Sequence, residues 1–197
     1  MSDPLRPRMT ESETALLQAI VPQGGRVLEF GAGGSTQFFF EHGVQELVSV
    51  ESDGEWLKTL VSSPLIRLQL KYGRWLPLHV DIGPTGAWGA PVSSSLDARW
   101  LEYHLFCWSH IENKHFDLAL IDGRFRVACA CQVLFHCTNS DVVVAFHDFW
   151  IRQEYHAILE FFDQKHSADS LCVMTPKPDL DWKRLGLVLQ EHLFCDA

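Results

Sequence analysis

Short apolar runs alternate with amphipathic stretches along most of the chain. The runs at residues 26–30 and 46–50 have the length and the continuous apolar character of strands that are buried on both faces. The stretches that follow, 35–41 and 53–60, repeat apolar residues at helical spacing and begin at residues that can cap a helix. This alternation predicts an α/β fold with a mostly parallel sheet and helices on both faces.

The same pattern predicts seven strands and six helices over a single domain, residues 1–197. We expect strands at 26–30, 46–50, 65–70, 116–121, 142–146, 171–175 and 185–190, and helices at 10–21, 35–41, 53–60, 97–111, 128–135 and 151–165. Residues 71–96 are rich in glycine, proline and tryptophan. We expect an irregular excursion there, with a short additional strand at 78–82.

Composition narrows the classes of partner. Of the 197 residues, 47% are hydrophobic and 21% are charged, which is typical of a folded globular protein. The net charge of -9 gives no basic surface for nucleic acid or anionic lipid. No secretory signal is evident, and the apolar runs are far shorter than the roughly 20 residues of a membrane span. We therefore expect a cytoplasmic protein with a small-molecule substrate, no nucleic-acid or membrane partner, and an oligomeric state that the sequence leaves open.

Six cysteines lie along the chain without any Cys-x-x-Cys spacing. The interpretation we favour is that they are reduced, buried thiols rather than metal ligands or disulfides.

The strongest functional signal follows the first predicted strand. The segment Glu29–Ser35 (EFGAGGS) joins that strand to a helix, so that a ligand can approach the backbone while helix N–H groups point into the same space. Glu51 ends the next strand 20 residues after Gly31, where a carboxylate can accept both hydroxyls of a ribose. Thr36 stands where the dinucleotide-binding pattern has its third glycine.

This arrangement resembles motifs I and II of the class I S-adenosylmethionine-dependent methyltransferases, whose domain is Rossmann-like and doubly wound. The resemblance covers roughly residues 25–148. It implies that Gly31 and Gly33 pass beneath the methionine part of the cofactor, with Glu29 fixing its ammonium group directly or through water. Glu51 would hold the ribose. The other cofactor-binding residues that we expect are Ala32, Ser35, Ser52, Asp81 and Asp122.

Alternatives remain open at three of these positions. Glu29 can be a structural acid that caps the loop, and Glu51 can cap a helix. At the adenine end, either Asp81 bonds the amino group or Trp88 covers the ring, and a tryptophan that simply packs in an ordered loop is as reasonable.

Two later strands also end in polar residues. Asp122 follows the strand at 116–121, and His147 and Asp148 follow the strand at 142–146, so all three side chains are expected at one crevice. The pattern is similar to that of metal-dependent O-methyltransferases. This implies that Asp122 and Asp148 bind Mg²⁺, Mn²⁺ or Zn²⁺, that His147 is a ligand or general base, and that all three residues are catalytic.

The pair His147-Asp148 departs from the Asp-Asn or Asp-Asp pairs of such families, and imidazole suits Zn²⁺ better than Mg²⁺. The alternative is that Asp122 lines the cofactor pocket and Asp148 caps a helix. Arg124 and Arg126 start a predicted helix, where positive charge opposes the helix dipole. Three interpretations stay open for them: pairing with nearby carboxylates, recognition of an acidic group of the acceptor, or simple solvent exposure.

The resemblance implies methyl transfer from S-adenosylmethionine to a hydroxyl of a small molecule, such as a sugar or a secondary metabolite. Two alternatives stay open. The first is a methyltransferase-like protein that binds the cofactor without catalysis. The second is an NAD(P)-dependent oxidoreductase, which shares the strand, the glycine turn and Glu51 but is disfavoured by Thr36.

Overall fold

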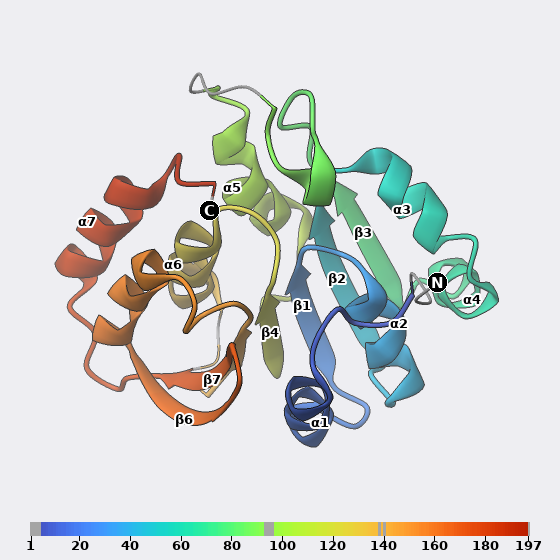
Figure 1. The fold of residues 1–197 in the computed structure, drawn as a ribbon, viewed down its shortest axis with the longest axis horizontal. Coiled ribbons are helices and arrows are strands. Elements are labelled where there is room, and N and C mark those ends of the chain that lie inside the picture. Colours follow the sequence, from blue (N-terminus) through green and yellow to red (C-terminus); the bar gives the residue numbers. More distant parts are fainter. Residues whose placement is uncertain (1–4, 93–96, 138, 140, 197) are drawn as a thin grey trace.

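The computed structural model describes residues 5–92, 97–137, 139 and 141–196, and Figure 1 shows its fold. Seven strands form one sheet in the order β3-β2-β1-β4-β5-β7-β6. They are β1 (Arg26–Phe30), β2 (Glu46–Glu51), β3 (Trp75–His79), β4 (Leu118–Ile121), β5 (Val143–Phe146), β6 (Phe162–Ala168) and β7 (Leu171–Pro176). Strands β1 to β5 are parallel, whereas β7 is antiparallel to both β5 and β6. The sheet is therefore mixed: an antiparallel hairpin extends a parallel sheet.

Helices cover both faces of this sheet (Figure 1). They are α1 (Glu11–Ile20), α2 (Gly34–Glu41), α3 (Gly54–Leu60), α4 (Pro64–Lys71), α5 (Trp100–His110), α6 (Arg126–His136) and α7 (Trp182–His192), with 3-10 helices η1 (Ala87–Gly89) and η2 (Gln153–Glu160). Neighbouring residues of one strand serve opposite cores: Val27 packs with α1 to α4, and Leu28 with α5 to α7. Because both faces of the parallel strands are covered, their carboxyl ends are the place where loops can form a site.

The strand predicted at 65–70 is wrong, because these residues belong to α4. Ser63 caps this helix by accepting a hydrogen bond from the Ile66 backbone N–H (3.5 Å), and Pro64 occupies its first position. The strand predicted at 78–82 begins earlier, as β3, and lies at an edge of the sheet, where Pro77 is tolerated. The predicted irregular excursion at 71–96 therefore contains β3 and η1, while its residues 93–96 lie outside the described residues.

The chain after Asp148 also differs from the prediction. Residues 151–165 were expected to be helical, but η2 ends at Glu160 and β6 follows. The strand predicted at 185–190 lies within α7, which Asp181 caps by accepting a hydrogen bond from the Arg184 backbone N–H (2.9 Å). The strand predicted at 171–175 is confirmed as β7, and its hairpin partner is β6.

Two further expectations concern the whole chain. No helix in the described part is long and apolar enough to cross a bilayer. All six cysteines are free; Cys195 is exposed and Cys137 half-buried, and the buried ones are Cys107, Cys129, Cys131 and Cys172. Burial raises the pKa of Cys131 to about 12, which makes its thiol unreactive at neutral pH.

Candidate functional site

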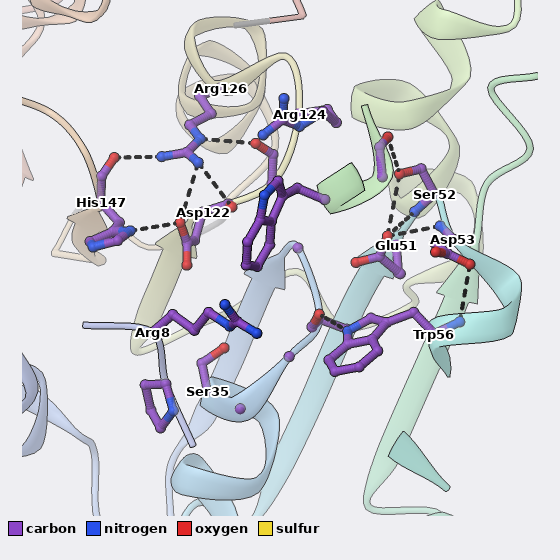
Figure 2. Close-up of a pocket in the computed structure, with 18 of the residues that line it drawn as sticks. Arg8, Ser35, Glu51, Ser52, Asp53, Trp56, Asp122, Arg124, Arg126 and His147 are labelled. Atoms are coloured by element: carbon purple, nitrogen blue, oxygen red, sulfur yellow. Dashed lines mark hydrogen bonds and ion pairs between the residues drawn. The ribbon is translucent and has the colours of Figure 1, made fainter. Parts of the chain in front are cut away.

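A cavity of about 560 Å³ opens where the carboxyl ends of β1, β2, β4 and β5 meet (Figure 2). Seven parts of the chain contribute to its walls: residues 6–8, 31–35, 51–53 with 56, 88–89, 103, 122–124 with 126, and 147–148 with 152. This edge is where open parallel α/β sheets bind their ligands.

The cavity brings together most of the residues predicted for the site. Those that line it are Gly31, Ala32, Gly33, Ser35, Glu51, Ser52, Asp122, His147 and Asp148. Two predicted residues, Glu29 and Asp81, do not line it.

The three glycines after β1 meet three different constraints. Gly31 has a φ of 92°, and a Cβ there would come within 2.7 Å of the Gly123 backbone in the loop after β4. A Cβ on Gly33 would meet nothing closer than 3.9 Å, so this residue presents an open face to the cavity. A Cβ on Gly34 would lie 2.0 Å from the carbonyl carbon of Arg6, which shows that the N-terminal segment packs directly on the start of α2. The part of this loop that presents backbone without a nearby side chain to the cavity is therefore Gly33.

Glu29 holds this loop from below. Its carboxylate is fully buried and accepts hydrogen bonds from the hydroxyls of Ser35, Thr36 (2.7 Å) and Ser49 (2.7 Å). Burial raises the pKa of Glu29 to about 7, although the three hydroxyls act in the opposite direction. Because Glu29 lies beneath the loop with its oxygens occupied, the geometry fits the structural alternative rather than direct contact with an ammonium group.

Glu51 ends β2 at the cavity wall (Figure 2). Its Oε1 accepts hydrogen bonds from the backbone N–H groups of Ser52 (2.7 Å) and Asp53 (2.8 Å). Its Oε2 has no partner among the described residues, so it is available to a ligand. Burial raises the pKa of Glu51 to about 7 despite these hydrogen bonds.

Two tryptophans and an arginine also line the cavity. The Trp56 indole N–H donates to the Ala32 carbonyl (2.8 Å), which ties the glycine loop to α3. Trp88 is 69% exposed and has a φ of 62°, and the Arg8 guanidinium lies 4.5 Å from its ring centre. Asp81 is exposed and takes part in a surface ion pair outside the cavity. Of the two residues expected at the adenine end, the cavity contains Trp88.

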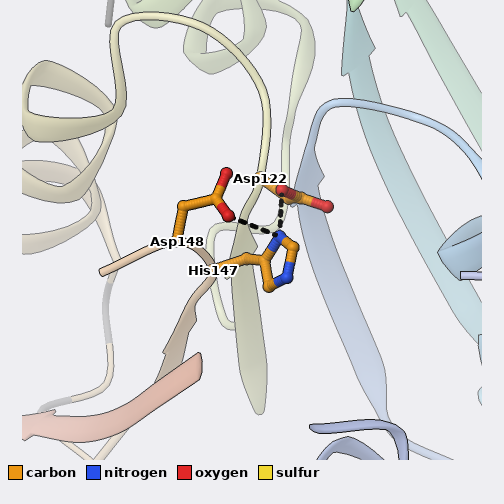
Figure 3. A group of neighbouring side chains, drawn as sticks. All are labelled: Asp122, His147 and Asp148. Carbon is orange, nitrogen blue, oxygen red and sulfur yellow. Dashed lines mark hydrogen bonds and ion pairs between the residues drawn. The ribbon is translucent and has the colours of Figure 1, made fainter. Parts of the chain in front are cut away.

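Asp122, His147 and Asp148 come together from the ends of β4 and β5, as their positions predict (Figure 3). His147 Nδ1 lies 2.9 Å from Asp122 Oδ1 and 3.9 Å from Asp148 Oδ1. Asp148 has a φ of 59°, a left-handed conformation that is unfavourable for a residue with a side chain. Such backbone strain concentrates at functional sites.

Arg126 neutralises the two acids of this cluster. Its side chain is 4% exposed, with Nη2 lying 3.3 Å from Asp122 Oδ1 and Nη1 lying 3.2 Å from Asp148 Oδ2. The guanidinium also donates to the backbone carbonyls of Gly123 (2.9 Å) and His147 (2.7 Å). Of the two partners expected for Arg126, the structure shows the nearby carboxylates.

This pairing bears on the expected metal site. One potential ligand atom from each of Asp122, His147 and Asp148 lies within 4.8 Å of the others, a spacing that would suit a metal ion. However, the buried guanidinium of Arg126 already bridges both carboxylates, and its positive charge would repel a divalent cation. The donor set in this arrangement therefore does not fit a metal, and we assign no step to one.

His147 lies between two acids. Burial alone would lower the pKa of His147, but the hydrogen bond to Asp122 and the negative charges of Asp122, Asp148 and Glu13 outweigh it, so the pKa is raised. Its Nε2 lies 3.5 Å from Glu13 Oε2 on α1. Both ring nitrogens thus face carboxylates, which favours a role for His147 in orienting Asp122 over one as a free base.

Sequence reasoning missed the N-terminal segment, Arg152 and the contact between Glu13 and His147. Glu13 forms a capping box with Thr10 at the start of α1, and its carboxylate also reaches His147. Arg6 and Arg8 precede that helix in a polar stretch without periodicity and reach the cavity only through tertiary packing. The one available sign was Gly34, a glycine beyond those that the cofactor motif needs.

Comparison with known proteins finds similarity to solved structures of methyltransferases. No family model and no curated protein match the chain. A solved structure of a methyltransferase-like protein from Silicibacter pomeroyi is 29% identical with a TM-score of 0.75, covering 97% of this chain and 99% of that one. A methyltransferase from Geobacter sulfurreducens is 10% identical with a TM-score of 0.51, covering 87% and 82% of the two chains. A fibrillarin pre-rRNA processing protein from Methanococcus jannaschii is 11% identical with a TM-score of 0.55, covering 86% and 77%. The last two show likeness of fold alone.

Proposed function

We propose that this chain binds S-adenosylmethionine in the cavity and methylates a hydroxyl of a small molecule. Its fold is that of the class I S-adenosylmethionine-dependent methyltransferases. The observation that carries the proposal is Glu51. It is a buried carboxylate at the end of β2 with one oxygen free at the cavity wall. An acid at this place can accept the two hydroxyls of a ribose.

The surrounding residues fit the rest of the cofactor. Gly33 gives the methionine end a surface without a side chain, and the first N–H groups of α2 are donors for its carboxylate. Trp88 offers a flat apolar face for adenine on the Glu51 side of the cavity. When bound, the cofactor supplies a methyl group on a positively charged sulfur, which carries most of the difficult chemistry.

The protein must then orient the acceptor and take up the proton of its hydroxyl. Asp122 lines the cavity and keeps Oδ2 without a partner in the described chain, while His147 and Arg126 both contact its Oδ1. We assign proton acceptance to Asp122 Oδ2, and the orientation of this carboxylate to His147. Asp148 contributes by fixing Arg126 against the cluster.

Cofactor binding is tested by calorimetric titration of the protein with S-adenosylhomocysteine and, separately, with NAD. We expect S-adenosylhomocysteine to bind and NAD not to bind. Replacing Glu51 with alanine should weaken binding by about 1.5–3 kcal/mol, the range for hydrogen bonds to a charged group, or roughly 10- to 150-fold. The matched control is Glu55→Ala, which removes an exposed acid of α3 outside the cavity. Binding of NAD instead, or wild-type affinity in Glu51→Ala, would overturn the proposal.

Catalysis is tested with cofactor carrying a labelled methyl group and a panel of hydroxyl compounds. We expect Asp122→Asn to lower the rate by about 10²- to 10⁴-fold, the range for general acid–base catalysis, and a chelator to leave the rate unchanged. Loss of activity with chelator and its return with Mg²⁺, Mn²⁺ or Zn²⁺ would favour the metal interpretation of Asp122 and Asp148 instead. Binding without transfer to any acceptor would favour a non-catalytic protein.

A further inference from the structure

We infer that the acceptor carries a carboxylate or phosphate group, and that Arg124 and Arg152 bind this group at the end of the cavity that holds Asp122. The inference rests on the proposed function, because it names the chemical class of the acceptor for the same site. It starts from two cationic side chains that have no carboxylate partner among the described residues.

The cavity is rich in one kind of cation. Five of the ten arginines of the chain line it, and none of the six lysines does. This gathering runs against the net charge of -9 of the chain as a whole. The planar guanidinium group suits two-pronged binding of a carboxylate or phosphate, whereas the ammonium group of lysine acts as a point charge.

The arginines that line the cavity differ in whether they already have partners within the protein. Arg126 is fully engaged with two carboxylates and backbone carbonyls, and Arg8 stacks on Trp88. Neither Arg124 nor Arg152 is paired with a carboxylate in the part of the chain that the structure describes.

Arg124 has spare donors. Its Nη1 donates to the backbone carbonyl of Asp196 (3.3 Å), while its Nε is buried without a hydrogen-bond partner among the described residues. Figure 2 shows Arg124 beside Arg126 and apart from Arg8. Arg126 is therefore paired with Asp122 and Asp148, whereas Arg124 has donors that can bind an anionic group of the acceptor.

Tyr155 lies next to the arginines of this part of the cavity. Its side chain is 1% exposed, and its hydroxyl has no hydrogen-bond partner among the described residues. The guanidinium groups of Arg126 and Arg152 lie 5.6 Å and 5.8 Å from its ring centre. Arg124 is close enough to act on the phenol electrostatically as well. Cations thus converge beside a buried hydroxyl, with no acceptor provided by the described chain.

The charge balance points the same way. Asp122 and Asp148 both form ion pairs with Arg126, so they do not neutralise Arg124 or Arg152. An uncharged sugar hydroxyl would leave these two guanidinium groups unpaired. A carboxylate or phosphate supplies the acceptor oxygens that they lack and is attracted by their field.

The experiment uses protein saturated with S-adenosylhomocysteine and titrates acids against their neutral counterparts. The carboxylate arm pairs 4-hydroxybenzoate with 4-hydroxybenzamide and salicylate with salicylamide, and the phosphate arm pairs glycerol 1-phosphate with glycerol. We expect at least one acid to bind tenfold or more tightly than its neutral counterpart, and the arm that responds identifies the anion.

Variants separate this inference from the proposed function. Arg152→Gln and Arg124→Gln should each remove tenfold or more of the preference for the acid, while S-adenosylhomocysteine binds within twofold of wild type. The control Arg67→Gln changes an exposed arginine of α4 outside the cavity and should leave the preference intact.

Failure takes distinct forms. If S-adenosylhomocysteine binds but no acid is preferred, or if the preference survives in both cavity variants, the acidic acceptor is overturned and the proposed function stands. If S-adenosylhomocysteine itself does not bind, the proposed function fails first.

Discussion

At the scale of single residues, Glu29 and Glu51 show how two buried acids on adjacent strands take different tasks. Both have a pKa raised to about 7, chiefly by burial. Glu29 is surrounded by hydroxyl donors beneath the loop, whereas Glu51 keeps Oε2 free at the cavity wall. Both acids therefore titrate near neutral pH, and under the proposed function only the ionisation of Glu51 acts directly on the cofactor.

Affinity for S-adenosylhomocysteine should fall as the pH falls through about 7, the pKa of Glu51. The ionised carboxylate accepts hydrogen bonds from both ribose hydroxyls, whereas protonation converts one acceptor into a donor. Well below pH 7 the dissociation constant should rise by up to about tenfold per pH unit. Calorimetry between pH 5.5 and 8.5 measures this, and Glu51→Gln should bind weakly with a flatter profile. A flat profile in the wild type would refute the role of Glu51.

Ionisation of Glu29 should make the free energy of unfolding depend on pH. Its pKa is about 7 in the folded protein and 4.5 in the unfolded chain, so the folded state holds more protons between these values. The contribution is fully present below pH 4.5 and is lost as the pH rises to about 7. The free energy of unfolding of Glu29→Gln should therefore fall less between pH 5 and 7.5 than that of wild type, by about 2–3 kcal/mol. Urea unfolding at both pH values measures this; Glu55→Gln, an exposed acid, should behave as wild type.

The residues of the site were predictable where a motif fixes both the residue and the backbone around it. The segment after β1, Glu51, and the cluster of Asp122, His147 and Asp148 lie where their positions at strand ends indicate. Asp81 was misplaced because β3 ends at His79 rather than at residue 82, so Asp81 falls in the loop that leaves the edge of the sheet.

At the scale of elements, the N-terminal segment and α2 form a contact that the sequence does not reveal. A Cβ on Gly34 would lie 2.0 Å from the Arg6 carbonyl carbon, although alanine itself is favourable in a helix. In Gly34→Ala the segment must move, and the contact of Arg8 with Trp88 at the cavity should be lost with it. Trypsin should then cleave after Arg8 at least several times faster than in wild type, and S-adenosylhomocysteine should bind more weakly.

The matched control is Gly186→Ala in α7. A Cβ there meets nothing within 4 Å, so this change should stabilise the protein by up to about 1 kcal/mol without altering cleavage. Equal cleavage rates in Gly34→Ala and wild type would show that the segment does not depend on this contact.

Elements were predictable where an apolar run is buried on both faces, as in β1, β2, β4 and β5. Residues 65–70 form a short apolar run, and periodicity alone cannot tell whether such a run is a strand or a helix. Ser63 and Pro64 at the start of the run favour a helix. Strand β6 was missed for another reason. It is an edge strand whose middle residues are exposed and polar, so it depends on pairing with β7 rather than on an apolar pattern of its own.

At the scale of the whole molecule, net charge describes the surface but not the cavity. The net charge of -9 gave no indication that arginines far apart in the sequence would converge. The N-terminal segment brings Arg8, the loop after β4 brings Arg124, and the turn after β5 brings Arg152 to the same hollow. Such convergence follows from the strand order and therefore requires the fold.

The reactivity of the cysteine thiols reports whether the packed core stays closed under native conditions. Burial raises the pKa of the thiols of Cys107, Cys129, Cys131, Cys137 and Cys172, so these thiols resist thiol reagents while the sheet and α6 stay packed. Ellman's reagent should titrate one thiol rapidly in the native protein, the exposed Cys195, and all six after unfolding. Cys195→Ser should remove the rapid phase. Rapid labelling of Cys129 or Cys131 in that variant would mean that α6 opens locally under native conditions, and the cavity wall that begins at Arg126 would open with it.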